Sequence, residues 1–131
     1  MSGADFPKQE RLKSRKSIDQ LVRTGARIHG KGLSLLWRIT DKDCGQRVKV
    51  AFSIPKRKIT KANQRNLMKR RLREAYRLNK SIVHEKALND NICLEMMFVY
   101  QDIAPMKFDK ARDKLVLLLT ELCKNWREKY S

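Results

Sequence analysis

Residues 47–54 carry the pattern that most restricts how this chain can fold. Every second position is apolar, with polar or small residues between them: Val48, Val50, Phe52 and Ile54. This period of two predicts a strand with one face on a core. Pro55 follows at once and cannot pair within a sheet, because proline has no backbone N–H group to donate. The chain must therefore leave the sheet here, through the basic connection of residues 56–61.

A strongly charged helix is expected next, beginning at Ala62 or Asn63 and ending near Asn79. At about 100° per residue, Asn79 shares one narrow arc with three apolar side chains, namely Met68, Leu72 and Ala75. Asn66 and the cationic side chains fall on an adjacent arc of roughly 140°, which holds Arg65, Lys69, Arg70, Arg73 and Arg77. One side of this helix is thus expected to pack on a sheet, while the neighbouring side carries charge.

The remaining elements follow from the same kinds of pattern. Apolar spacing predicts helices over residues 14–24 and 108–129, and apolar runs predict strands over residues 33–40 and 92–101. Gly25 ends the first helix, and Pro105 precedes the last. The last helix should bury one stripe of side chains, formed by Leu115, Leu118, Leu119, Leu122 and Trp126.

The order helix, strand, strand, helix, strand, helix predicts an α+β fold in which helices pack on a small sheet. A hairpin loop over residues 41–46 would join the first two strands. The chain shows no repeat and no second domain, so we expect one domain over residues 1–131, with flexible tails at about 1–10 and 127–131.

The composition indicates the kind of partner. The chain has 31 Lys and Arg against 14 Asp and Glu, a formal net charge of +17. Such a fold repels itself without a polyanion, and nucleic acid is the natural one. A membrane surface competes poorly, since no apolar run approaches the roughly 18 residues needed to span a bilayer. Cys44, Cys93 and Cys123 are odd in number and widely spaced, which favours free thiols in a reduced, cytoplasmic protein without structural zinc.

The cationic helix needs a further argument, because a run of charge is most often a solvated surface. Glu74 is the only acid within it, and like charges one turn apart destabilise a helix. That cost suggests an external counter-charge. Arginine dominates the helix and binds phosphate through paired hydrogen bonds. A face this dense, without the setting of a DNA-recognition helix, favours a folded RNA recognised by its shape and phosphates.

No group of residues has the pattern of a catalytic site. His29 and His84 are isolated, and an isolated histidine is far more often structural than catalytic. Asp41 and Asp43 are close together but fall in the expected loop, where such residues usually serve the turn. We therefore expect no catalytic residue and no metal ligand. A protein-only nuclease, built from acidic residues around a metal, is a weak alternative.

Three pairs on the charged helix, after a strand and a basic turn, form a motif: Arg65-Asn66, Lys69-Arg70 and Arg73-Glu74. This motif resembles the signature of the bacterial ribonuclease P protein subunit. The similarity covers nearly the whole chain, because it extends to Phe6, Arg11-Leu12, Gly25 and Ile54-Pro55-Lys56-Arg57. Leu67 departs from the signature, since a third basic residue is usual at that position.

The resemblance implies a fold like the second domain of ribosomal protein S5, with a mixed sheet and a left-handed βαβ crossover instead of the usual right-handed one. It also implies an endoribonuclease in which a catalytic RNA subunit removes the 5′ leader of precursor tRNA by Mg²⁺-dependent hydrolysis. The protein subunit binds that RNA and the leader. We therefore expect ribonuclease P RNA and precursor tRNA as partners, one protein per RNA, no membrane, and Mg²⁺ held mainly by RNA.

The resemblance also implies residue roles. The RNA subunit would be bound by Lys56, Arg57, Arg65, Asn66, Lys69, Arg70, Arg73 and Arg77. The leader would lie between the first helix and the sheet, at Ile18, Val22, Leu36, Ala51 and Ser53. Ile18 and Val22 are equally compatible with ordinary core positions. A ribosome-associated RNA-binding protein of the same fold is the main alternative, because the cationic face would suit it equally well.

Overall fold

A computed structural model describes residues 8–40 and 47–130, with side chains as far as Trp126. The elements in chain order are η1 (Lys8–Glu10), α1 (Arg15–Thr24), β1 (Ala26–Ile28), β2 (Leu33–Thr40), β3 (Val48–Ser53), α2 (Ala62–Asn79), α3 (Ser81–Asn89), β4 (Cys93–Tyr100) and α4 (Phe108–Tyr130). The expected α+β class is confirmed. Asp41, Asp43 and the rest of the loop at 41–46 lie outside the described residues.

The strands form one mixed sheet of four in the order β1-β2-β4-β3. β4 pairs antiparallel with β2 and parallel with β3. The expected hairpin between β2 and β3 is therefore wrong, because β4 lies between these two strands. β4 takes the central place because it is buried on both faces at most of its positions, as its sequence CLEMMFVY allows. β3 is left at the edge of the sheet.

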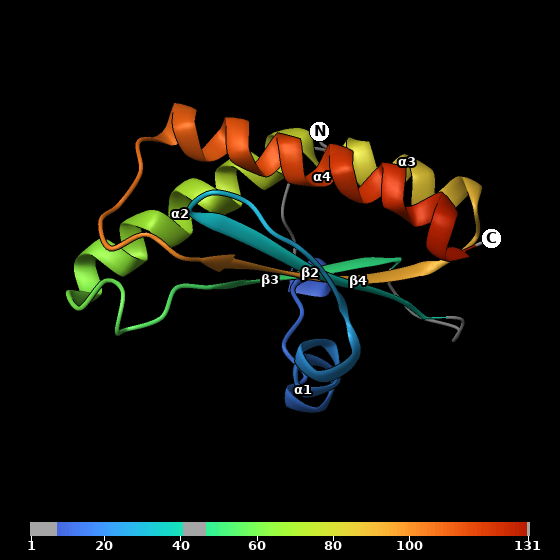
Figure 1. The fold of residues 1–131 in the computed structure, drawn as a ribbon, viewed down its shortest axis with the longest axis horizontal. Coiled ribbons are helices and arrows are strands. Elements are labelled where there is room, and N and C mark those ends of the chain that lie inside the picture. The colour runs from blue at the N-terminus through green and yellow to red at the C-terminus, as the bar shows by residue number, and fades with distance from the viewer. Residues whose placement is uncertain (1–7, 41–46, 131) are drawn as a thin grey trace.

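Helices cover the two faces of the sheet unequally (Figure 1). Helices α2, α3 and α4 lie over one face, and α1 lies alone on the other. The main core fills the space under the larger layer, and the expected stripe of α4 is buried there from Leu115 to Trp126. A second, smaller core lies under α1 and consists of Leu12, Leu21, Leu36 and Met97.

α1 has the ends that its sequence predicts. The Ser14 hydroxyl accepts a hydrogen bond from the Ser17 N–H at 3.2 Å, and the Gly25 N–H donates to the Leu21 carbonyl. Arg38 of β2 ties the helix to the sheet, because it donates to Gln20 at 3.0 Å and to Glu95 of β4 at 2.6 Å. These contacts fix α1 against β2 and β4.

The connection from β3 to its parallel neighbour β4 runs through α2 and α3. Residues Met68, Leu72 and Ala75 of α2 are fully buried, as expected, and Asn79 is partly exposed. Tyr76 is also fully buried and extends the packing face beyond the expected arc. Sequence analysis missed α3, which follows because Lys80 keeps helical backbone angles, φ −65° and ψ −20°. The left-handed sense of the crossover stays a prediction.

Two further findings bear on the sequence-based expectations. Cys93 is disulfide-bonded, so the expected free thiol is wrong for this residue, whereas Cys123 is free and half-buried. Burial raises the pKa of the Cys123 thiol. Among the described residues, no helix has the length and apolar character needed to cross a membrane.

Candidate nucleic-acid interface

The basic connection and the first turn of α2 are locked together by Arg65. Its Nη1 atom donates to the carbonyl oxygens of Ile59 and Thr60 at 2.9 and 2.8 Å. Ile59 is buried, so these bonds hold the connection against the body of the protein. Lys56 and Arg57 are exposed in the same connection. Arg65 thus has a structural task that its place in the motif did not reveal.

The cationic residues of α2 divide into three groups. Asn66 and Arg70 are exposed. Arg77 is paired with Glu74, to which it donates at 2.6 and 2.7 Å, and this bonding lowers the pKa of the Glu74 carboxyl. Lys69 and Arg73 are partly buried and turn toward β3. On the expected cationic arc, the Arg70 side chain is therefore exposed to a partner, whereas the charge of Arg77 is balanced by Glu74.

Arg71 is not part of this arc. Its Nη1 atom donates to the carbonyl oxygen of Met106, in the connection that leads to α4. Arg71 therefore bonds to the protein itself at this point. It does not replace the basic side chain that the family signature usually has at the position of Leu67.

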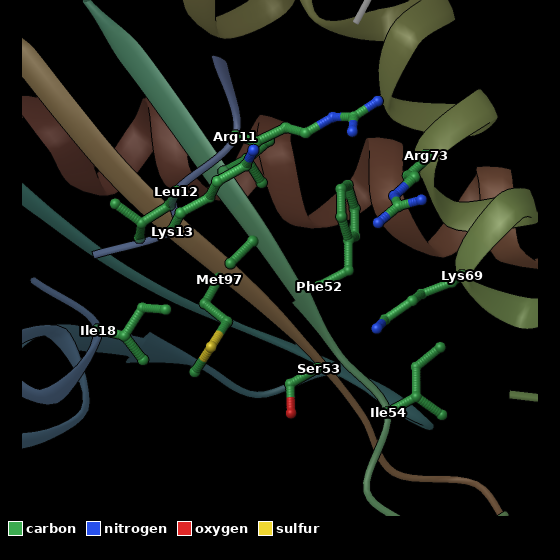
Figure 2. A pocket seen from close by; sticks show the side chains of 12 residues that line it. Arg11, Leu12, Lys13, Ile18, Phe52, Ser53, Ile54, Lys69, Arg73 and Met97 are labelled. Atoms are coloured by element: carbon green, nitrogen blue, oxygen red, sulfur yellow. The ribbon is translucent and has the colours of Figure 1, made fainter. Parts of the chain in front are cut away.

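Arg73 faces a second guanidinium across the edge of the sheet. Its Nε atom is buried and has no hydrogen-bond partner within the described part of the chain. Burial first, and the charge of Arg11 second, lower the pKa of Arg73. Figure 2 shows Arg11 and Arg73 extending toward each other, with the ring of Phe52 beside them. An anion bound between the two guanidinium groups would reduce this repulsion.

These residues open into a pocket of about 520 Å³ at the outer edge of β3, where the segment before α1 pairs with Val50. Its lining is drawn from the segment before α1, from α1, from β3 and β4, and from α2: Arg11, Leu12, Lys13, Ile18, Val50, Ala51, Phe52, Ser53, Ile54, Lys69, Arg73 and Met97 (Figure 2). Side chains from both faces of β3 line the pocket, because the pocket lies along the outer edge of this strand. Four of these side chains are cationic and none is acidic.

The floor of the pocket is partly aromatic. Phe52 stacks on Phe98 with ring centroids 5.6 Å apart and planes at 11°, and it meets Tyr76 edge to face at 6.2 Å. Its ring is partly exposed while its neighbours Phe98 and Tyr76 are fully buried. The core thus supports one aromatic face at the pocket.

The structure brings together three of the five residues assigned to a leader cleft. Ile18, Ala51 and Ser53 line the pocket. Leu36 is only 3 % exposed in the small core, and Val22 is 51 % exposed and outside the lining. The reason is the orientation of α1, which buries Leu21 and turns Val22 away from the sheet. Ile18 both lines the pocket and packs on the small core, so the two positions expected for it, in the cleft and in the core, are compatible.

Seven residues of the pocket were not assigned to RNA or leader binding from the sequence: Arg11, Leu12, Lys13, Val50, Phe52, Ile54 and Met97. The family resemblance included Arg11, Leu12 and Ile54, and that was the one available signal. Phe52 was assigned to the core by its alternation, and only the edge position of β3 exposes it.

His84 belongs to a different cluster, with Glu10, Lys80 and Tyr76, and none of these four residues lines the pocket. Glu10 accepts from Lys80, and His84 lies 3.6 Å from Glu10 and 3.1 Å from the Tyr76 hydroxyl. Burial lowers the pKa of His84 and raises that of Tyr76 to well above its usual value. In the described ranges, no three His, Cys, Asp or Glu side chains are grouped as metal ligands would be.

The fold is an α+β fold with one mixed sheet and most of its helices on one face. Cationic residues of α2 also line the pocket at the edge of the sheet, so the protein is suited to bind a polyanion. The family model described as Ribonuclease P matches residues 6–123. The chain therefore belongs to the ribonuclease P protein family, as the resemblance implied.

Named relatives agree with this assignment. The ribonuclease P protein component of Geobacter sp. strain M21 is 37% identical over 82 residues, which cover 63% of this chain and 67% of the relative. That of Dictyoglomus thermophilum is 28% identical over 114 residues, covering 85% and 86%.

Solved structures share the fold. The RNase P protein from Thermotoga maritima gives a TM-score of 0.67 at 21% identity, covering 86% of this chain and 96% of that one. The Staphylococcus aureus protein gives 0.67 at 15% identity, covering 85% and 93%. At these identities the likeness shows the fold alone, and it confirms the expected fold class.

Proposed function

We propose that this chain is the protein component that binds the catalytic RNA subunit of ribonuclease P and the 5′ leader of precursor tRNA, and so promotes endonucleolytic removal of the leader. Family membership supports the assignment to ribonuclease P and to tRNA processing. The observation that carries the finer proposal is the continuity of two cationic surfaces. Lys69 and Arg73 belong both to the face of α2 and to the edge pocket.

The outer part of this surface is assigned to the RNA subunit. Lys56, Arg57, Asn66 and Arg70 are exposed along the basic connection and α2. Arginine forks and an amide suit the phosphates and 2′-hydroxyls of a folded RNA. Arg65 contributes indirectly as well, because it fixes the connection that presents Lys56 and Arg57.

The pocket is assigned to the single-stranded leader. Its cations lie on two sides, from the segment before α1 and from α2, and its floor includes the face of Phe52. Cations that follow a backbone around an aromatic surface are the usual means of binding single strands without strict sequence preference.

The protein's own contribution is binding and orientation. The four cationic side chains of the pocket would repel a free divalent cation. We therefore assign Mg²⁺ mainly to RNA phosphates, which bring their own negative charge, and hydrolysis to the RNA subunit. One protein per RNA and a cytoplasmic location complete the proposal.

Reconstitution tests it. The purified protein is incubated at low Mg²⁺ with a bacterial ribonuclease P RNA and a precursor tRNA, with protein alone and RNA alone beside it. We expect the mature 5′ end to require both, and the Lys56→Ala, Arg70→Ala protein to lose the stimulation. Lys107→Ala with Lys110→Ala removes the same charge from exposed residues of the α4 region and should keep it.

Two outcomes would contradict the proposal. Cleavage by the protein alone would place an active site in this chain. Tight RNA binding without any stimulation of cleavage would favour the ribosome-associated alternative.

A further inference from the structure

A buried ion pair fastens the N-terminal segment to the helical layer. The Glu10 carboxylate accepts from Lys80 Nζ through both oxygens, at 3.0 and 3.1 Å. The two side chains are only 8 % and 9 % exposed. Glu10 lies in η1, and Lys80 lies where α2 passes into α3. The pair therefore joins residues that are 70 positions apart in the sequence.

The residues that follow Glu10 form one wall of the pocket. The Leu12 N–H donates to the Val50 carbonyl at 2.9 Å, and the Leu12 side chain enters the small core. Arg11 and Lys13, on either side of Leu12, line the pocket instead (Figure 2). This short segment is thus fixed before Arg11 by the ion pair and after it by Leu12.

Arg11 lies close to other cations of the pocket. It faces Arg73, and Lys69 and Lys13 line the same pocket. The repulsion among these charges opposes the close approach of this segment to α2. The hydrogen bonds of a buried ion pair have a preferred direction, whereas apolar packing does not. The pair can therefore set the position of the segment more closely than apolar contacts could.

We propose that Glu10 and Lys80 are a positioning pair, which holds Arg11 and Lys13 against the repulsion of α2 so that the pocket can contact phosphates of an extended single-stranded RNA. This inference rests on the proposed function, since it names residues that act on the leader site without touching the leader. Arg11 makes the contact, and Glu10 acts only through Arg11.

The test compares binding of precursor tRNA with that of the same tRNA lacking its leader, over a series of salt concentrations. Arg11→Ala should weaken binding of the leader-bearing RNA alone and reduce its salt slope by about one. Glu10→Gln should do the same. In the Glu10→Gln background, Arg11→Ala should then change affinity less than about twofold, because both changes remove one contact.

Control variants separate positioning from general stability. Leu119→Ala truncates a fully buried residue of α4, which lines no part of the pocket, and should lower the melting temperature without changing the leader's contribution. The reversed pair Glu10→Lys, Lys80→Glu should restore leader binding. If Glu10→Gln does not fold, Glu10→Met with Lys80→Met removes the pair without leaving a buried charge alone. That variant should show the same loss of leader binding.

The outcomes distinguish this inference from the proposed function. Unchanged RNA binding in Arg70→Ala as well as in Glu10→Gln would contradict the proposed function. If Arg70→Ala weakens binding while Glu10→Gln behaves like Leu119→Ala, or while the effects of Glu10→Gln and Arg11→Ala add in full, the positioning role is overturned.

Discussion

Replacing Arg73 by methionine should stabilise the free protein and weaken its binding of RNA. The Arg73 Nε atom is buried without a hydrogen-bond partner among the described residues, and Arg11 faces the same guanidinium. Methionine is unbranched and flexible, so it can follow the packing of the arginine stem while removing both unfavourable features. The two properties should therefore move in opposite directions.

The size of the gain follows from these contacts. A buried polar group left unsatisfied costs about 1–3 kcal/mol, and we take the lower end because Arg73 is only partly buried. A gain of about 1 kcal/mol corresponds to a rise of about 3–5 °C in melting temperature for a chain of this length. Removing one charge from a chain of net charge +17 should make the gain larger at low salt.

Thermal unfolding followed by circular dichroism measures the first effect, and salt-dependent RNA binding measures the second. The salt slope should fall by about one, the share of one phosphate contact. Arg70→Met is the matched control, because Arg70 is exposed on the same helix. It should reduce the salt slope with little change in melting temperature. A lower melting temperature in Arg73→Met would refute the view of Arg73 as a strained cation awaiting an anion.

Three further changes test other parts of the structure. Arg65→Ala should cost about 1–2 kcal/mol and speed hydrogen exchange in residues 56–61, because it removes the bonds that hold this connection; unchanged exchange there would argue against that role. Burial lowers the pKa of His84, so the unfolded chain binds its proton first, and stability should be full above about pH 6.5 and decline below it. In urea titrations over a range of pH, the free energy of unfolding should fall less below about pH 6.5 in His84→Gln than in the unchanged protein. An equal fall in both proteins would show that His84 is not its cause. Trp126→Ala should cost about 3–5 kcal/mol in the same assay, since its side chain is fully buried in the main core.

Local pattern predicted most helices and strands closely. β2 and α2 have the expected bounds, and α1 is capped by Ser14 and Gly25. These features depend on neighbours within a few residues, so the sequence alone contains their causes. β1 and α3 were missed because β1 has only three residues and α3 continues from α2 with no stop signal.

The order of the strands depends on long-range contacts, which the local sequence pattern does not reveal. The two apolar faces of β4 place it inside the sheet, which separates β2 from β3 and leaves β3 as an edge strand. This edge position leaves Phe52 partly exposed and makes it part of the pocket. No spacing within residues 47–54 could predict it, because it depends on a strand some 40 positions later.

The sign of the charge, the division of α2 into packing and cationic sides, and the family signature can all be read from the sequence alone. Which cations are available to a partner depends on the folded structure. Arg77 is paired with Glu74 and Arg65 with backbone carbonyls, whereas Arg73 is held beside Arg11 at the pocket. A cation's strength as a binding group depends on its desolvation and its neighbours, and only the folded chain brings those together.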